Sequence, residues 1–313
     1  MKLRPAADAM HYVDLQVNGF EGIDFNADDL STRDVVQACA KIRSTGVAGI
    51  LATVITDDVT KMCRRIANIA GAIADDSSVA ETVWGIHVEG PFLNAEPGYI
   101  GAHPPSHARQ ADPGAMNELL DAGAGYVKLV TLAPERDPNF EVTRALVERG
   151  VCVSAGHCNP TADELKGASG AGLSMFTHLG NGCPRLMDRH DNIIQRALSL
   201  AGDLWIGFIA DGVHVPLPTL GNYMRAAGID RCFVVTDAIA AAGCGPGTYE
   251  FAGQTVVVDE NLATWAADRS HLTGSASTFP HLVENLRDGL GYTAQQIEAL
   301  TSRNPRQATG MLT

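Results

Sequence analysis

The sequence predicts a single (β/α)8 barrel of the TIM type, and three observations support this fold class. At 313 residues the chain is long enough for one large domain, and barrels of about 250 residues commonly stay undivided. Eight short apolar or β-branched runs are separated by stretches in which apolar residues recur every three or four positions. Polar residues gather where those runs end.

The predicted strands follow one another along the chain. They span Tyr12–Val17, Val47–Ile55, Thr82–Val88, Tyr126–Leu132, Val151–Ala155, Leu173–Thr177, Leu204–Ile209 and Cys232–Val235. Helices are predicted between them, including Thr32–Ser44, Lys61–Ala74, Pro113–Ala122 and Glu141–Arg149. Gly46, Gly150 and Gly172 each precede a strand, as helix C-caps do. Strands that alternate with helices in this way favour a parallel barrel over an open sheet.

The last quarter of the chain adds two features to a single domain over residues 1–313. Tyr249–His271 contains YEFAGQTVVV, whose period of two predicts a β-hairpin insertion at about 248–274. Phe279–Leu290 and Ala294–Thr301 are predicted helices that close the barrel within about 275–310. Thr293 is the expected cap of the second of these helices.

Composition restricts the classes of function. Hydrophobic residues make up 45% and charged residues 19%, as in globular proteins with a sizeable core. The apolar runs are too short to span a bilayer, and residues 1–11 lack the apolar segment of a secretory signal. The seven cysteines include no CxxC pair, so we expect reduced thiols and a cytoplasmic protein. A net charge of −13 argues against nucleic acid or an anionic membrane as a partner.

Polar residues mark the ends of the predicted strands. They are Gln16, Asn18, Thr53, Glu89, Thr131, His157, His178, Asp211 and Asp237. In a (β/α)8 barrel the C-terminal strand ends carry loops that converge on one mouth, where active sites lie. The sequence therefore predicts that these side chains share one site.

Glu89, His157 and His178 predict a metal site. They occur in HVEGPF, SAGHCN and FTHLGN, where glycines let the backbone approach an ion closely. Imidazole and carboxylate ligands suit Zn2+, with Fe2+ or another divalent ion as alternatives, and a catalytic site keeps one position open for water. Taken alone, each histidine is more often a hydrogen-bonded barrel residue. Together, at successive strand ends, the three predict a bound metal.

Two further residues lie beside the predicted metal. Asp237, in FVVTDA after the eighth run, is the predicted general base, because a carboxylate that faces the metal can take a proton from the bound water. The alternative is a cap for the following helix or turn. His87 shares the face of Glu89 on its strand, and we predict a packed core histidine there rather than a support for the metal ligands.

Five motifs together resemble the N-acetylglucosamine-6-phosphate deacetylase family of the amidohydrolase superfamily. They are HVEGPF (87–92), SAGH (154–157), THLGN (177–181), ADGVHV (210–215) and VTDA (235–238), and the resemblance covers nearly the whole chain. Most amidohydrolases carry HxH in the first strand, whereas DLQVNG places Gln16 and Asn18 there, as is typical of mononuclear members. Amides are weaker ligands than imidazole, so we expect one tightly bound metal per chain and a vestigial second position.

The resemblance implies further site residues. His103, in GAHPP, resembles the histidine that helps to polarise the substrate carbonyl, and His214 resembles one that contacts the sugar phosphate. Asn181 and Gly182 lie where the family contacts the sugar. Arg189 resembles the arginine that grips the phosphate, often across a dimer interface, so a homodimer is expected. Its alternative is a solvated loop charge, because PRLMDRHDN departs from the family's sequence.

The resemblance also bears on the domains. The family usually flanks its barrel with a small β-sandwich, which we expect to be largely absent because the first strand begins near residue 12 and the chain stops soon after NPRQATG. Tyr249–His271 resembles the family's hairpin insertion after the base. The missing sandwich and the altered 183–192 loop bear on the identity of the substrate more than on the class of reaction.

We therefore expect a hydrolase that removes the acetyl group of an N-acetylated amino sugar, first of all N-acetylglucosamine 6-phosphate. The metal lowers the pKa of its water to about 7, Asp237 moves the proton from that water to the amine, and the metal and His103 stabilise the oxyanion. Alternatives are a deacetylase of a different N-acetylhexosamine, an N-acyl amino acid deacylase, a cyclic amidase, or a non-catalytic barrel that binds a sugar or a partner, because a barrel alone does not separate these.

Overall fold

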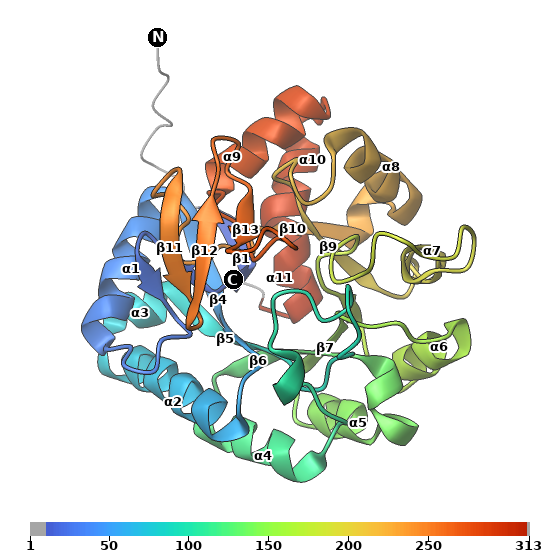
Figure 1. Cartoon of the computed structure of the whole chain (residues 1–313), viewed down its shortest axis with the longest axis horizontal. Coiled ribbons are helices and arrows are strands. Elements are labelled where there is room, and N and C mark those ends of the chain that lie inside the picture. The colour runs from blue at the N-terminus through green and yellow to red at the C-terminus, as the bar shows by residue number, and fades with distance from the viewer. Residues whose placement is uncertain (1–10, 312–313) are drawn as a thin grey trace.

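Eight parallel strands form a barrel in the computed structural model, which describes residues 11–311 (Figure 1). In spatial order they are β1 (Tyr12–Val17), β4 (Val47–Ile55), β5 (Val83–Glu89), β6 (Val127–Leu132), β7 (Cys152–Ala155), β8 (Met175–Phe176), β9 (Trp205–Ile209) and β10 (Cys232–Val235). This order confirms the predicted (β/α)8 barrel. Residues 1–10, which belong to the segment that we expected not to be a secretory signal, lie outside the described residues.

The barrel closes between its last and first strands. A parallel bridge joins Val17 to Ala238, three residues beyond the end of β10. The side chain of Asp14 in β1 accepts hydrogen bonds from the backbone nitrogen and the hydroxyl of Thr236. At the other end of β10, the Asn304 amide donates to the carbonyls of Ile229 and Cys232. The side chain of Asp14 therefore adds to the backbone contacts that close this seam.

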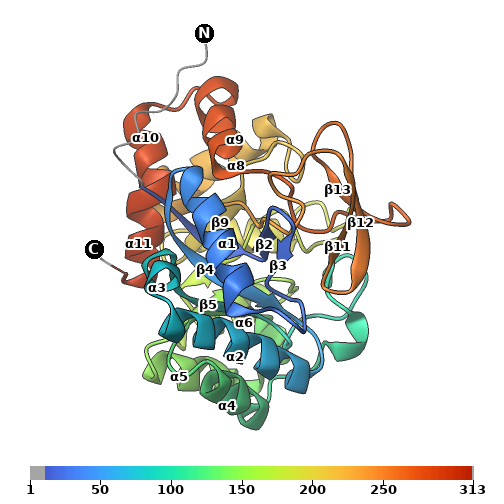
Figure 2. The same ribbon diagram turned by 90° about the vertical axis from the view of Figure 1, so that its left-hand side faces the viewer.

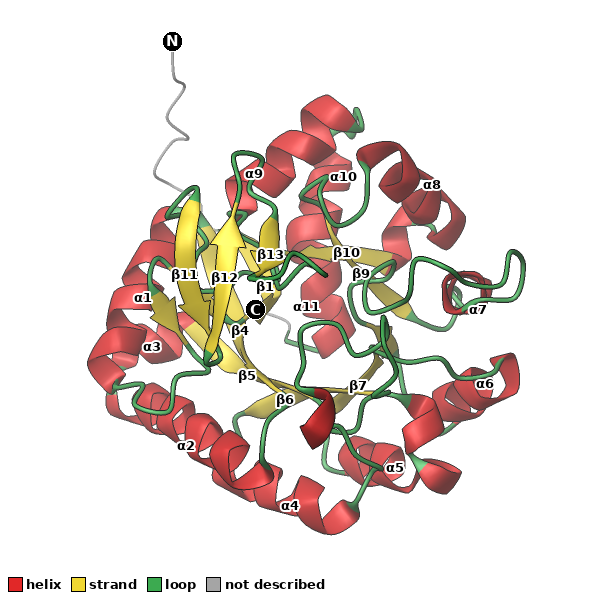
Figure 3. Ribbon diagram, viewed as in Figure 1, coloured by secondary structure: helices red, strands yellow, loops and turns green. Residues whose placement is uncertain are grey.

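Helices cover the outside of the barrel (Figure 3). They are α1 (Thr32–Ser44), α2 (Val59–Asp75), α3 (Ser77–Thr82), α4 (Pro113–Ala122), α5 (Glu141–Glu148), α6 (Ala162–Gly170), α7 (Ile193–Ser199), α8 (Leu217–Ala227), α9 (Phe279–Glu284), α10 (Ala294–Glu298) and α11 (Asn304–Thr309). Both predicted C-terminal helices begin as α-helices and continue as π-helical segments. These segments are Asn285–Gly289 after α9 and Ala299–Arg303 after α10.

Local sequence signals account for many helix ends. Ser31 caps α1, and its side chain and that of Asp34 form a capping box. Thr293 caps α10 in the same way with Gln296, which confirms the cap expected there. Gly46 and Gly172 precede strands with φ of 87° and 108°, a left-handed conformation that glycine adopts at little cost. The glycines expected to end helices therefore do so for a conformational reason.

A smaller antiparallel sheet lies over one end of the barrel, on the side opposite the C-terminus (Figure 2). It contains β11 (Gly247–Phe251), β12 (Gln254–Val258) and β13 (Thr264–Ala266), and a short hairpin of β2 (Gly19–Phe20) and β3 (Ile23–Asp24) lies near it. Two hydrogen bonds hold the β11–β12 turn to the barrel loops. The backbone nitrogen of Ala252 donates to Asp24 at 2.7 Å, and the Gln254 amide donates to the carbonyl of Ala102 at 3.2 Å.

Apolar residues fill the space between the barrel and its helices and the base of the barrel interior. Val13, Leu51, Leu129 and Phe233 meet inside the barrel below the polar strand ends. The interior is therefore apolar at its base and polar at its mouth.

The seven cysteines form no disulfide. Within residues 11–311, no helix combines the length and apolar character that crossing a bilayer requires.

Candidate active site

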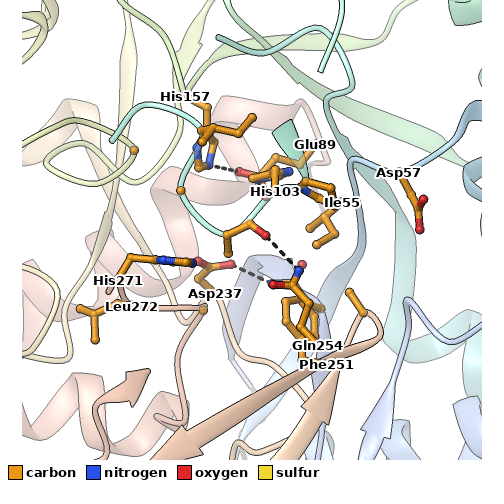
Figure 4. Close-up of a pocket in the computed structure, with 18 of the residues that line it drawn as sticks. Ile55, Asp57, Glu89, His103, His157, Asp237, Phe251, Gln254, His271 and Leu272 are labelled. Carbon is orange, nitrogen blue, oxygen red and sulfur yellow. Dashed lines mark hydrogen bonds and ion pairs between the residues drawn. The ribbon is translucent and has the colours of Figure 1, made fainter. Parts of the chain in front are cut away.

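Glu89, His157 and His178 converge at the mouth of the barrel. Glu89 is the last residue of β5, and the two histidines follow β7 and β8. The Oε1 atom of Glu89 lies 3.0 Å from Nε2 of His178 and 3.4 Å from Nε2 of His157, and the two Nε2 atoms are 3.2 Å apart. All three side chains are buried. Figure 4 shows Glu89, His157 and Asp237 around one cavity.

The spacing of these three atoms fits a divalent ion. Tetrahedral coordination with bonds of about 2.0 to 2.1 Å places neighbouring ligand atoms about 3.3 to 3.4 Å apart, close to the distances above. Nδ1 of His157 lies 2.8 Å from the Tyr99 carbonyl oxygen, which can only accept, so this nitrogen carries the proton. Its Nε2 lone pair therefore points at the cluster. Second partners of this kind orient histidine ligands in metal sites.

The backbone at this cluster is strained at three functional positions. His157, His178 and Asp237 have φ values of 51°, 33° and 51°, in a region that few residues other than glycine adopt. Such conformations cost on the order of 1 to 3 kcal/mol each and persist where the surrounding structure enforces them. All three strained residues are among the four that the sequence predicts to bind the metal or move the proton, and Glu89 is the fourth.

Gln16 and Asn18 place amide donors beside the carboxylates. The Gln16 amide nitrogen lies 3.1 and 3.0 Å from the two oxygens of Glu89. The Asn18 amide nitrogen donates to Oδ1 of Asp237 at 2.8 Å. These N–H groups supply partial positive charge beside both carboxylates, at the two residues for which a vestigial second metal position was predicted.

His103 presents a proton donor to the cluster. The backbone N–H of Thr56 donates to Nδ1 of His103 at 3.3 Å, so in the neutral ring the proton is on Nε2. That nitrogen lies 3.8 Å from Oε2 of Glu89, beyond hydrogen-bond distance. Burial lowers the pKa of His103 to about 3. The ring thus stays neutral and can donate to an oxygen that enters the cavity.

Two carboxylates of the site have opposite pKa shifts. Burial alone would raise the pKa of Glu89, but its contacts with the rings of His157 and His178 hold it well below its usual value. Burial and the charge of Glu89 raise the pKa of Asp237 to about 6. Glu89 is thus fixed as an anion, whereas Asp237 can bind and release a proton near neutral pH. Groups that act as general bases are tuned in this way.

His214 is held by its own acidic partner. Its Nδ1 lies 2.7 Å from Oδ2 of Asp211, and its backbone nitrogen donates to Oδ1 of the same side chain. Burial opposes the charged ring, but the charge and hydrogen bond of Asp211 raise the pKa of His214 overall. His214 lines the same cavity as the metal cluster.

Two of the three loop residues predicted to bind the substrate line the cavity, and the third does not. Asn181 and Gly182 line the cavity, which has a volume of about 1740 Å³. A Cβ atom on Gly182, whose φ is 59°, would lie 2.9 Å from Nδ1 of His157, so only glycine lets the loop approach that ring. Arg189 is exposed on the 183–192 loop and does not line the cavity, whereas Arg185 does.

His87 is a buried core residue, as predicted. Its Nε2 lies 2.8 Å from the hydroxyl of Thr131, which in turn lies 2.8 Å from the hydroxyl of Thr177. Burial lowers the pKa of His87 to about 4, so the ring is neutral. These groups form a polar layer inside the barrel near Glu89. They separate the metal cluster from the apolar base.

Sequence reasoning missed several residues of the site. The carbonyl of Tyr99 fixes the ring of His157, and the side chain of Gln254 from β12 lines the cavity (Figure 4). Asp14, which bonds to Thr236, carried a signal, because a lone acid inside an apolar strand is rarely buried without a partner. Tyr99 acts through its backbone, which no residue type reveals.

Comparisons with known proteins point to one family. No family model matches the chain. The human N-acetylglucosamine-6-phosphate deacetylase is 31% identical over 96% of this chain and 74% of its own length. An N-acetylgalactosamine-6-phosphate deacetylase from a Shewanella species is 36% identical over 79% of this chain and 60% of its own length.

A solved structure gives the same result for the fold. A mutant N-acetyl-D-glucosamine-6-phosphate deacetylase from Mycobacterium smegmatis, in complex with N-acetyl-D-glucosamine-6-phosphate, has a TM-score of 0.86 and 28% identity over 96% of this chain and 77% of that chain. The fold, the strand-end cluster and a relative that is 31% identical over 74% of its own length lead to one conclusion. This chain belongs to the N-acetylglucosamine-6-phosphate deacetylase family, whose members are hydrolases of carbon–nitrogen amide bonds.

Proposed function

We propose that this protein hydrolyses the acetamide group of N-acetylglucosamine 6-phosphate to give glucosamine 6-phosphate and acetate. The observation that carries the proposal is the convergence of Glu89, His157 and His178 on one point beside Asp237, inside the barrel of this deacetylase family. Human and Mycobacterium smegmatis relatives are named for this activity.

We propose that Glu89, His157 and His178 hold one divalent ion, with Zn2+ as the first candidate and Fe2+ as an alternative. Two imidazoles and one carboxylate form a donor set common in catalytic zinc sites. Such an ion, when bound, acts as a Lewis acid that acidifies water and polarises a carbonyl. The amides of Gln16 and Asn18 occupy the sides of Glu89 and Asp237, which supports one ion per chain.

The remaining side chains have distinct roles in the proposed reaction. Asp237 takes a proton as the oxygen of water bonds to the acetyl carbon, and returns it to the amine nitrogen as the carbon–nitrogen bond breaks. His103, a neutral donor through Nε2, stabilises the charge that develops on the carbonyl oxygen. Because burial disfavours an isolated charge on Asp237, its carboxylate is a better base than an exposed one.

Substrate recognition is proposed to depend on both ends of the sugar. Asn181 and Gly182 lie at the wall of the cavity where the sugar ring would contact them. His214, paired with Asp211, is placed to bind the phosphate. Because Arg189 does not reach the cavity of its own chain, we propose that it contacts the phosphate in the partner subunit of a homodimer. We also propose that the enzyme acts in the cytoplasm, which its disulfide-free cysteines support.

A second candidate substrate is N-acetylgalactosamine 6-phosphate. A relative named for deacetylation of that sugar is 36% identical, against 31% for the human protein, although it matches a smaller part of the chain. The two sugars differ only in the orientation of one hydroxyl group, so the metal cluster and Asp237 would serve both. The preference for one sugar over the other would be decided by the residues that line the cavity away from the acetyl group.

Release of acetate tests the proposal. Purified protein, with its metal content measured, is incubated with N-acetylglucosamine, N-acetylgalactosamine and N-acetylmannosamine, each with and without a 6-phosphate, and with one N-acetyl amino acid. We expect the highest kcat/KM for N-acetylglucosamine 6-phosphate. Preference for the galactosamine epimer would favour the second candidate, and activity on the amino acid alone would reject amino sugar deacetylation.

A further inference from the structure

The barrel seam beside the proposed base contains a buried acid that the reaction has not used. Asp14 lies in the middle of β1 and is 2% exposed. Its Oδ2 atom accepts the hydroxyl of Thr236 at 2.6 Å, and its Oδ1 atom accepts the backbone N–H of Thr236 at 3.2 Å. The carboxylate thus takes the place that a backbone carbonyl would have in a strand ladder between β1 and β10.

The hydroxyl of Thr236 continues this connection past Asp237. It accepts the backbone N–H of Ala238 at 3.1 Å, so this hydrogen bond links the two neighbours of Asp237. The carbonyl of Ala238 accepts the backbone N–H of Asn18 at 2.7 Å, and the carbonyl of Asp237 itself accepts that of Ser275 at 2.9 Å. Both neighbours of Asp237 are therefore held by this part of the chain, Thr236 by Asp14 within β1 and Ala238 by Asn18 directly after it.

Asp237 needs such support because its backbone is strained. Its φ of 51° is unfavourable for a residue with a side chain, and residues kept in this region are held there by their surroundings. The strand β10 ends at Val235, so regular strand pairing does not extend to it. Ser275 and Asn18 bond to Asp237 directly, and the groups that bond to residues 236 and 238 hold the backbone on either side of it.

We propose that Asp14 and Thr236 are positioning residues, which together hold the backbone of Asp237 in its left-handed conformation and so aim its carboxylate at the metal cluster. The inference rests on the proposed function, because it concerns the base of that reaction. Neither side chain touches the substrate in this scheme. Their effect on the reaction passes through the geometry of Asp237.

Two substitutions break the connection at different atoms. Thr236→Val removes the hydroxyl that joins Asp14 to the Ala238 nitrogen but keeps the shape of the side chain. Asp14→Asn keeps one oxygen for the Thr236 nitrogen but places an NH2 group against the Thr236 hydroxyl. We expect each variant to lose roughly tenfold to a hundredfold in kcat, as is usual when a catalytic group is misplaced by a fraction of an ångström to 1 Å. KM and bound metal should stay close to the wild-type values, and Thr236→Ser should restore kcat.

A matched control separates positioning from general loss of stability. Asn304 is fully buried and bonds to Ile229 and Cys232 at the opposite end of β10, about 13 Å of strand away from the site. Asn304→Ala should lower the unfolding temperature as much as Thr236→Val or more, with kcat unchanged. A drop in kcat that follows the loss of stability in all three variants would overturn the proposal.

A double-mutant cycle gives the second test. If Asp14 acts through Asp237, adding Asp14→Asn to Asp237→Asn should change the residual kcat by less than about twofold, because residues that act as one unit are not additive. Full multiplication of the two effects would overturn the proposal. If wild-type protein deacetylates no N-acetyl sugar, the proposed function fails instead. Amide exchange at Ala238, which should accelerate in Thr236→Val but not in Asn304→Ala, still tests the connection in that case.

Discussion

Asp14 should make the stability of the protein depend on pH, and Asp14→Asn measures this dependence. Burial raises the pKa of the Asp14 carboxyl to about 7, although hydrogen bonds from Thr236 and Gln16 act in the opposite direction. An aspartate in an unfolded chain has a pKa of about 3.9. The folded state therefore binds more protons at this position than the unfolded state between about pH 4 and 7.

The sign of the effect follows from these two pKa values. Because the folded pKa is the higher one, the contribution of Asp14 to stability is fully present below about pH 4 and is lost as pH rises through about 7. The two values differ by about three units, and each unit corresponds to about 1.4 kcal/mol, so the loss is on the order of 4 kcal/mol. Asparagine does not titrate in this range and removes the dependence.

Urea unfolding of metal-loaded wild type and Asp14→Asn at several pH values between about 5 and 8 provides the assay. Other titrating groups, including the proposed metal ligands, are common to both proteins and cancel in the difference. We expect the free energy of unfolding of the variant, minus that of the wild type, to rise by about 1 kcal/mol per pH unit up to about pH 7. A difference that stays constant with pH would refute the buried, proton-binding state of Asp14.

Three further predictions concern the metal and the base. His178→Ala should lose the metal and the activity, because two ligands hold an ion weakly; near-stoichiometric metal by mass spectrometry would contradict the ligand assignment. Asp237→Asn should keep the metal and the fold while kcat for acetate release falls by about a hundredfold to ten-thousandfold; near-normal turnover would remove Asp237 from the mechanism. Purified protein should hold about one tightly bound ion per chain; a second ion at about 3.5 to 4 Å, ligated by Gln16 or Asn18 in a crystal structure, would show otherwise.

The fold was predictable because the apolar patterns of strands and helices act together with the topology of a parallel barrel. Apolar runs predict the strands, and parallel strands in a barrel bring their C-terminal ends to the same face. Glu89, His157 and His178 were therefore expected to meet although 89 positions separate the first from the last, and the structure places them together. Strand ends were less predictable. The predicted strand Leu173–Thr177 is only Met175–Phe176 in the structure, and Thr177 already belongs to the loop that carries His178.

Other features of the site depend on contacts that no local pattern encodes. Asp14 and Thr236 are 222 positions apart, and only closure of the barrel makes them partners. The proton on Nε2 of His103 follows from a backbone N–H of Thr56, so the residue type alone did not reveal it. The positive φ of Asp237 is likewise a tertiary effect, because neither its own residue type nor VTDA demands it. Sequence thus predicts which groups take part, whereas packing determines their protonation and direction.

The position of Arg189 leads to a test of both phosphate binding and subunit arrangement. Arg189 is exposed and does not line the cavity of its own chain, so a role in phosphate binding requires a second subunit. Arg189→Ala should then lower kcat/KM for the phosphorylated sugar by one to three orders of magnitude, about 1.4 to 4 kcal/mol, and barely affect the unphosphorylated one, because only phosphate accepts the two charge-assisted bonds of an arginine. Equal loss on both substrates would make Arg189 a structural residue.

Mixed dimers then show which subunit supplies the arginine. An Arg189→Ala chain keeps its own Asp237, and an Asp237→Asn chain keeps its own Arg189. If the arginine acts across the interface, a mixed dimer combines an intact metal cluster and base from the first chain with an arginine from the second, and part of the activity on the phosphorylated sugar returns. If Arg189 serves its own chain, neither subunit of the mixed dimer is complete and activity stays at the sum of the two variants. That result, or a monomer by light scattering, would contradict the proposed homodimeric phosphate site.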